Sequence, residues 1–216
     1  MLWNTHSNLK GKHAILAPSQ PSWLNYDDVQ LTQKRNSSFA QKIGTETHAF
    51  AEMHIKHGFK LTKFNKNEFL LYLLEKNIPE QAIDTDFIFP NLQAYINDAI
   101  SLHMDPEILL CYDETYAFGT ADAISFDKGY LKIHDLKTGK TPAHIEQLLV
   151  YAALFCLEYG VNPFDICTEL RIYQNSEIVC MSPTPDDIYD VINKCIYDVN
   201  FYHNLEAKEG AKHVSR

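Results

Sequence analysis

The sequence lacks an apolar segment long enough to cross a bilayer, and its first residues lack the pattern of a secretory signal peptide. Cysteine is scarce, with five widely spaced residues, an odd number, and no Cys-x-x-Cys motif. We therefore expect a cytoplasmic protein with reduced thiols, no membrane association and no zinc ribbon. Internal repeats are absent and the hydrophobic content is an ordinary 45%, so we predict one globular domain over residues 1–216.

An excess of positive charge is also lacking, since the formal net charge is −9. This balance argues against a protein that coats nucleic acid non-specifically. It leaves room for a local basic channel, because lysine and arginine gather at Lys34 with Arg35 and again between Lys56 and Lys66. Such clusters are more often solvated faces than phosphate contacts.

The most informative segment of the chain runs from Gly119 to Lys140. Two apolar runs, at 116–126 and 130–136, flank Asp127-Lys128-Gly129 and predict a β-hairpin. Asp122 lies on the first run, and Asp135 and Lys137 end the second. Since side chains alternate along a strand, Asp135 and Lys137 share a face. Two carboxylates are hard oxygen ligands that suit Mg²⁺ or Mn²⁺, and a lysine beside them can orient or deprotonate an attacking water.

A simpler interpretation is that Asp135 and Lys137 form a solvated ion pair at the end of a strand. Two features count against it. The pair follows an apolar run, and Asp122 stands within Ala121-Asp122-Ala123-Ile124, where a carboxylate without a cation would be unfavourable. The segment therefore predicts metal-assisted attack of water on a phosphodiester, with the Leu136 carbonyl as a further ligand.

These residues, together with others before and after them, resemble a known superfamily. Asp122, the triplet Asp135-Leu136-Lys137, and then Gln147 and Tyr151 resemble the PD-(D/E)XK nucleases, and more closely their RecB-like exonuclease branch of phage and prophage type. Upstream, Gly44-Thr45-Glu46-Thr47-His48 followed by Glu52 resembles the first motif of that branch. The resemblance covers roughly residues 38–182. It implies an α+β fold with a restriction-endonuclease-like core, in which a central mixed β-sheet is flanked by helices.

The resemblance also implies a role for each motif residue. The catalytic set is Asp122, Asp135, Lys137, Gln147 and Tyr151. One or two Mg²⁺ or Mn²⁺ ions are expected on His48, Asp122, Asp135 and the Leu136 carbonyl, with Glu114 as a further ligand or an acid that orients one. DNA contacts are expected from Gly44, Thr138 and Lys140. Some relatives carry an iron–sulfur cluster that includes an N-terminal cysteine, which this sequence lacks, so no iron–sulfur cluster is expected.

Each of these residues also has an ordinary structural interpretation. His48 could be a helix histidine bonded to a neighbour, Glu114 part of a structural ion pair, and Gln147 and Tyr151 polar residues at a helix edge. The sequence argues against a phosphate-binding P-loop at Gly139-Lys140-Thr141, because the motif needs a glycine where His134 stands.

The pattern of elements divides the chain into two parts. Residues 1–105 are expected to form a mainly helical lobe that carries the His48 motif, with helices at 37–58, 67–77 and 87–102. Ser37-Ser38 would cap the first helix, and Trp23-Leu24 would anchor residues 13–25 on the domain. Residues 106–216 form the sheet core, with a helix at 145–159 and strands at 166–173 and 177–181. A final helix would start at Pro185 with Thr184 as N-cap and fray from about Ala207.

The function implied by the resemblance is that of a metal-dependent deoxyribonuclease, most simply a DNA exonuclease in phage or prophage recombination or DNA processing. Its partners would be a DNA substrate and a single-strand annealing or recombination protein, within the cytoplasm of a bacterial host cell. An oligomer is compatible with this function. The alternative is a catalytically idle DNA-binding module on the same fold. Exonuclease and endonuclease action, polarity and strand preference all stay open.

Overall fold

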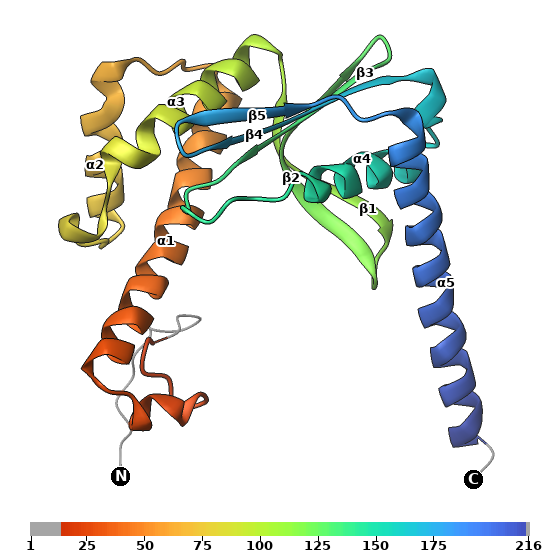
Figure 1. The fold of residues 1–216 in the computed structure, drawn as a ribbon, viewed down its shortest axis with the longest axis horizontal. Coiled ribbons are helices and arrows are strands. Elements are labelled where there is room, and N and C mark those ends of the chain that lie inside the picture. Colours follow the sequence, from red (N-terminus) through yellow and green to blue (C-terminus); the bar gives the residue numbers. More distant parts are fainter. Residues whose placement is uncertain (1–13, 215–216) are drawn as a thin grey trace, which may run out of the picture.

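A computed structural model describes residues 14–214 and has an α+β fold, in which a five-stranded mixed sheet is flanked by helices (Figure 1). Before the first strand, the described chain is helical. The main helices there are α1 (Asp28–His57), α2 (Lys66–Glu75) and α3 (Thr85–Ser101), joined by loops and short 3₁₀ turns. The predicted helical N-terminal part is therefore confirmed for the described residues.

The sheet follows, with its strands side by side in chain order: β1 (Asp105–Asp113), β2 (Ala117–Asp127), β3 (Tyr130–Leu136), β4 (Cys167–Gln174) and β5 (Glu177–Met181). Neighbouring strands are antiparallel except β3 and β4, which are parallel. Parallel neighbours need a crossover, and α4 (Glu146–Tyr159) supplies it. The final helix is α5 (Pro185–Val214). The predicted β2–β3 hairpin, the β4–β5 pair and the crossover helix are all confirmed.

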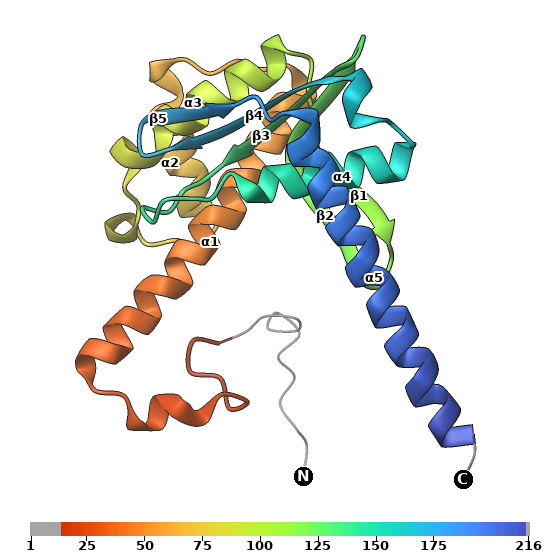
Figure 2. The ribbon, with the colours of Figure 1, turned by 45° about the vertical axis from the view of Figure 1, so that its right-hand side comes forward.

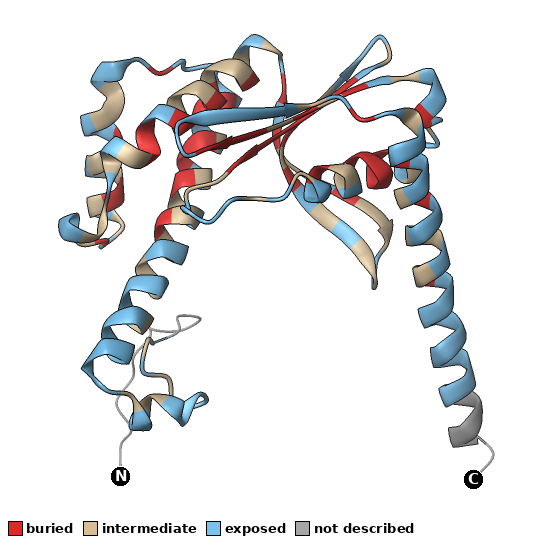
Figure 3. Cartoon of the chain, in the orientation of Figure 1, coloured by how far each residue is buried: buried red, intermediate tan, exposed pale blue. Residues whose placement is uncertain are grey.

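Two apolar cores lie on opposite faces of this sheet (Figure 3). One core joins α1, α2 and α3 to the sheet through side chains such as Phe50, Phe69, Leu92, Leu136 and Tyr173. The other joins α4 and α5 to the opposite face, with Leu131, Ile133, Ala152, Leu154 and Ile188 among its members. The end of β3 therefore packs against helices on both faces of the sheet, because Leu136 belongs to the first core and Ile133 to the second.

Local capping explains where the long helices begin and end. Asp27 and Gln30 form a reciprocal capping box at the start of α1, and Gly58 ends the helix in a left-handed conformation (φ 70°). The prediction that Ser37-Ser38 caps this helix was wrong, because both serines lie inside it. At α5, Thr184 and Asp187 cap each other as predicted. That helix continues to Val214, so the expected fraying from Ala207 was also wrong.

The N-terminal half of α1 and the C-terminal end of α5 extend away from the sheet in the same direction (Figures 1 and 2). Residues 28–42 and 204–209 are mostly exposed. The short helix at Pro21–Asn25 lies beside the free end of α1, where Leu24 is 68% exposed and the Trp23 indole donates to the Ala17 carbonyl at 3.0 Å. The predicted anchoring of Trp23-Leu24 on the domain was therefore wrong. Within residues 14–214, no helix is both long and apolar enough to span a membrane.

Candidate active site

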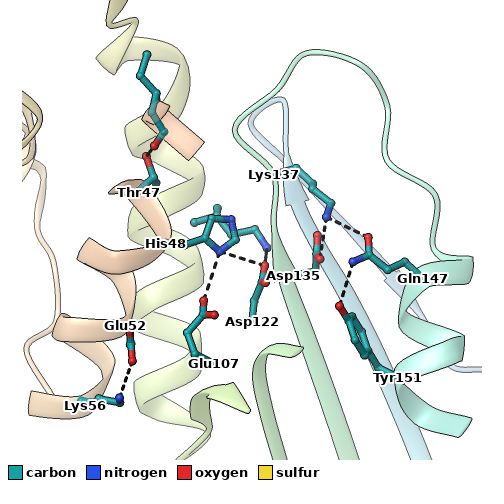
Figure 4. A network of polar contacts seen from close by, with 12 residues as sticks. Thr47, His48, Glu52, Lys56, Glu107, Asp122, Asp135, Lys137, Gln147 and Tyr151 are labelled. Atoms are coloured by element: carbon teal, nitrogen blue, oxygen red, sulfur yellow. Dashed lines mark hydrogen bonds and ion pairs between the residues drawn. The ribbon is translucent and has the colours of Figure 1, made fainter. Parts of the chain in front are cut away.

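The predicted histidine of α1 lies next to an acidic pair at the start of the sheet (Figure 4). His48 Nδ1 lies 3.5 Å from Asp122 Oδ2 on β2 and 3.6 Å from Glu107 Oε1 on β1. One potential ligand atom from each of these three residues falls within 4.8 Å of the others. The fold therefore brings together His48 and Asp122, which are 74 positions apart in the numbered sequence.

Glu107 is a member of this group that the sequence did not suggest. Its neighbours Pro106 and Ile108 pair with Ala123 and Ala121, which places Glu107 across the ladder from Asp122. Its backbone has φ 54°, in the left-handed region that a non-glycine residue seldom adopts. Such strained backbone persists where surrounding structure enforces it, often at functional sites.

The ionised form of Asp122 is unfavourable in the folded protein without a bound cation. Burial raises the pKa of Asp122 to about 6, and the charge of Asp135 adds to the rise while His48 opposes it. Burial lowers the pKa of His48, but contact with Glu107 and the charge of Asp122 outweigh that effect and raise it overall. The Leu136 N–H donates to Asp122 Oδ2 at 2.9 Å and fixes the carboxylate. A bound cation would relieve the repulsion between these acids.

A second cluster, of predicted catalytic residues, surrounds Asp135 at the end of β3. Lys137 Nζ lies 2.9 Å from Asp135 Oδ1 and 3.1 Å from Gln147 Oε1 on α4. Gln147 in turn lies 3.4 Å from the Tyr151 hydroxyl, one helical turn further along. Asp135 is buried, and its second oxygen, Oδ2, has no hydrogen-bond partner. An unpartnered buried carboxylate oxygen is unfavourable without a cation or a water.

The residues predicted to contact DNA lie close to this cluster, and two of them, Gly44 and Thr138, lie next to each other. A Cβ added at Gly44 would lie 3.3 Å from Thr138 Oγ1, so Gly44 allows α1 to approach the loop after β3. Lys140 is exposed on that loop, and its Nζ lies 5.1 Å from the centre of the Phe87 ring. The predicted role of the Leu136 carbonyl stays a prediction.

Two acidic residues singled out from the sequence lie elsewhere. Glu114 was expected on the strand before Asp122, but it is exposed in the turn between β1 and β2, seven residues beyond Glu107. It does not join the cluster, because β1 carries it to the opposite end of the strand. Glu52, from the His48 motif, pairs with Lys56 at 2.5 Å.

Tyr95 on α3 is a further residue that the sequence did not single out. It is 2% exposed and packs edge-on against Tyr173, with ring centres 5.5 Å apart. Burial raises its pKa well above the usual value, and the charges of Asp122, Glu107 and Asp135 raise it further. Tyr95 thus lies close to all three acids. In the sequence, Tyr95 stands among the apolar residues of α3, so its pattern predicts only a core residue.

The donor set fits a hard divalent cation. His48 offers an imidazole nitrogen, while Glu107 and Asp122 offer carboxylate oxygens, and carboxylates suit Mg²⁺ and Mn²⁺. The unpartnered Asp135 Oδ2 is a further oxygen donor near the same place. This arrangement could bind a metal beside a lysine that is held by two hydrogen bonds.

Comparison with known proteins gives a family without a described activity. No curated protein matches the sequence. A family model described as "Protein of unknown function (DUF2800)" matches residues 13–166, which is more than two thirds of the chain and includes every residue of the candidate site. The chain therefore belongs to the DUF2800 family.

Proposed function

We propose that this protein is a Mg²⁺- or Mn²⁺-dependent deoxyribonuclease of the RecB-like exonuclease type, acting in phage or prophage recombination or DNA processing. The observation that carries the proposal is the meeting of two groups at one end of the sheet. His48, Glu107 and Asp122 form a potential ligand set, and the Asp135–Lys137–Gln147 cluster lies next to it.

The restriction-endonuclease-like core is part of the same proposal. It is supported by the order of the elements, in which a helix is followed by three antiparallel strands, a crossover helix and a parallel fourth strand. Further support comes from the elements that carry the candidate residues: the histidine is on α1, the acids are on β2 and β3, and the amide and phenol are on the crossover helix. Glu107 adds an acid from β1.

In the proposed mechanism, His48, Glu107, Asp122 and Asp135 would hold the metal. When bound, the metal would act as a Lewis acid that neutralises charge on the phosphate and makes water a better nucleophile. Lys137 has three N–H donors, and two of them point to Asp135 and Gln147. The remaining donor is free to orient the attacking water or to stabilise the phosphate in the transition state.

Gln147 and Tyr151 act through Lys137. Gln147 Oε1 accepts from the lysine, and Tyr151 lies against Gly119 of β2, where an added Cβ would come within 3.1 Å of the ring. Strand β2 therefore packs against Tyr151, and the Tyr151 hydroxyl contacts Gln147. Gln147 in turn restricts the position of the Lys137 ammonium group. Positioning of this kind contributes to rate because misplacement of about 1 Å can cost roughly a hundredfold.

The test is a cleavage assay on linear duplex, nicked circular and single-stranded DNA, with Mg²⁺, Mn²⁺, Ca²⁺ or EDTA. We expect Mg²⁺ and Mn²⁺ to support cleavage, Ca²⁺ to support little, and EDTA to abolish it. The variant Asp135→Asn should be inactive, and the matched Asp165→Asn, outside the site, should cleave like the parent. DNA binding without cleavage under any metal would favour the idle DNA-binding module. Full activity in EDTA would exclude the metal mechanism.

A further inference from the structure

A groove of about 410 Å³ opens beside the candidate active site, between α1, the start of α3 and the loop after β3. This volume falls within the range of about 300–1,000 Å³ that is usual for small-molecule sites. Thr138 and Gly139, which follow directly on Lys137, form one wall. The groove is therefore continuous with the end of β3 that carries the candidate catalytic lysine.

The lining of the groove combines three kinds of chemistry. Phe39 on α1 and Phe87 on α3 supply half-buried aromatic rings, and Asn36 and Gln81 supply exposed side-chain amides. Lys140 supplies a cation at the rim, 5.1 Å from the centre of the Phe87 ring. Aromatic rings, amides and a neighbouring cation match the needs of a nucleotide, which offers a flat base, donors and acceptors on the base edge, and a phosphate.

The charges around the groove suit a nucleic-acid strand. The Arg35 guanidinium lies 4.9 Å from the centre of the Phe39 ring, so a second cation lies beside an aromatic residue that lines the groove. The one acid in the lining, Asp84, is already used as the N-cap of α3, where its Oδ1 accepts from the Phe87 N–H at 3.1 Å. One cation thus lines the groove and a second lies beside its Phe39 ring, while the one acid of the lining is engaged by the backbone at the start of α3.

The groove also lies at a suitable distance from the candidate metal ligands. Ile43 and Phe39 precede His48 on α1 by five and nine residues, which is about 8 to 14 Å along the helix axis. Even a stacked strand rises about 3.4 Å per nucleotide, so a strand of at most about four nucleotides spans this distance. One strand could thus reach from the groove to His48.

We propose that this groove binds an unstacked nucleobase of a single DNA strand, a few nucleotides from the phosphate that is cleaved. The inference rests on the proposed nuclease function and adds a substrate class to it. The base lies against Phe39 and Phe87, its edge meets Asn36 or Gln81, and Lys140 and Arg35 meet the adjoining phosphates. Because a paired base cannot enter, the groove selects single-stranded DNA or a frayed end over an intact blunt duplex.

The proposal is tested by binding and cleavage of a short fluorescein-labelled oligothymidine, compared with a blunt duplex of the same length. Binding is measured by fluorescence anisotropy with Ca²⁺, and cleavage with Mn²⁺. The double variant Phe39→Leu, Phe87→Leu keeps apolar side chains but removes both rings, and should weaken binding of the single strand about tenfold. Ala40→Trp, which fills the groove but leaves every residue proposed to contact the DNA unchanged, should weaken binding of the single strand similarly. Phe64→Leu changes an 81% exposed ring outside the groove and should have no effect.

Thermal denaturation of each variant shows whether weaker binding reflects a lost DNA contact or an unfolded protein. Ala40 is at an exposed helix position, so Ala40→Trp provides an independent measurement if the double variant is unstable. Unchanged single-strand affinity in Ala40→Trp, or tighter binding of the blunt duplex by the parent, would overturn the groove assignment. If the parent binds the single strand through the groove but never cleaves it, the nuclease proposal fails and the base site stands. If the parent cleaves the single strand and the groove variants bind and cleave it equally well, the nucleobase-binding groove is refuted and the nuclease proposal stands.

Discussion

Glu107 and Asp122 stand across from each other on neighbouring antiparallel strands, and His48 Nδ1 lies within 3.6 Å of a carboxylate oxygen of each. Like charges placed directly opposite in a sheet destabilise it. Here one of the two residues also adopts a left-handed backbone. A cation held between the two carboxylates would offset this repulsion.

The role of Glu107 can be tested against that of Glu114, the other acid of this region. Glu107→Gln should weaken Mn²⁺ binding about tenfold or more and lower activity with it, because a charged ligand is lost. Glu114→Gln should change neither, since its side chain is exposed in the β1–β2 turn. Isothermal titration with Mn²⁺ measures both. Equal losses in the two variants, or a loss only in Glu114→Gln, would remove Glu107 from the ligand set.

Asp122 should make the metal-free protein less stable as the pH rises. Its pKa is raised from 3.8 to about 6, so the folded protein binds this proton more tightly than the unfolded chain does. The stabilisation is complete below pH 4 and is lost as the pH rises through about 6, at a cost on the order of 3 kcal/mol. Asp122→Asn removes this titration. At neutral pH and in EDTA, it should therefore melt several degrees higher than the parent.

Added Mn²⁺ should reverse that order, because the metal stabilises the parent by mass action and does so little for Asp122→Asn. Thermal melts with EDTA and with Mn²⁺, at pH values on both sides of 6, provide the measurement. The matched control is Asp127→Asn, at the exposed end of β2. A metal-free Asp122→Asn that melts lower than the parent at neutral pH would contradict the assigned cost.

Lys137 should act on turnover more than on binding. Lys137→Ala removes a donor proposed to serve the transition state, so kcat should fall at least a hundredfold while KM and Mn²⁺ affinity stay within a fewfold of the parent. Lys137→Arg should restore little, since a guanidinium differs in shape and stays protonated. Lys128→Ala, at an exposed turn, is the control. Steady-state and single-turnover kinetics distinguish the outcomes, and a near-parental kcat in Lys137→Ala would support the idle binding module.

Gly119 should matter for rate through Tyr151. An alanine Cβ at this position would lie 3.1 Å from Tyr151 Cε1, so Gly119→Ala should displace the ring and loosen the Gln147–Lys137 contact. We expect kcat to fall several-fold with little change in melting temperature. Thr115→Ala, at an exposed position in the β1–β2 turn outside both proposed sites, serves as the control for cleavage kinetics. Identical kinetics for the two alanine variants would show that Tyr151 does not position the cluster.

Much of the sheet and most residues of the candidate site could be predicted from the sequence. The turn at Asp127-Lys128-Gly129 fixes the register of β2 against β3, and the alternation of side chains along a strand places Asp135 and Lys137 on one face. The order of elements along the chain, with a helix at 145–159 between the strand pairs, follows from the spacing of the apolar runs. Helix starts were less predictable, because the Asp27–Gln30 capping box competes with Ser37-Ser38 as a signal.

Glu107 could not be found in the same way. Its place opposite Asp122 depends on the register of β1 against β2, which is set by the turn at Asp113–Tyr116, where no glycine marks the hairpin. Its left-handed backbone (φ 54°) is at a glutamate, a residue type that does not indicate this conformation in a sequence. Tyr95 was hidden for another reason, because an aromatic residue on the apolar side of a helix is ordinarily only a core residue.

The two long helices that leave the sheet give the molecule an extended outline. A helix of 30 residues is about 45 Å long, and the distal part of α5 and much of the first half of α1 are exposed. A compact chain of 216 residues would have a radius of gyration near 17 Å, so X-ray scattering from this protein in solution should give a larger value. Any ligand or second copy that draws the two helices together would then be detected as a contraction, even where no activity assay exists.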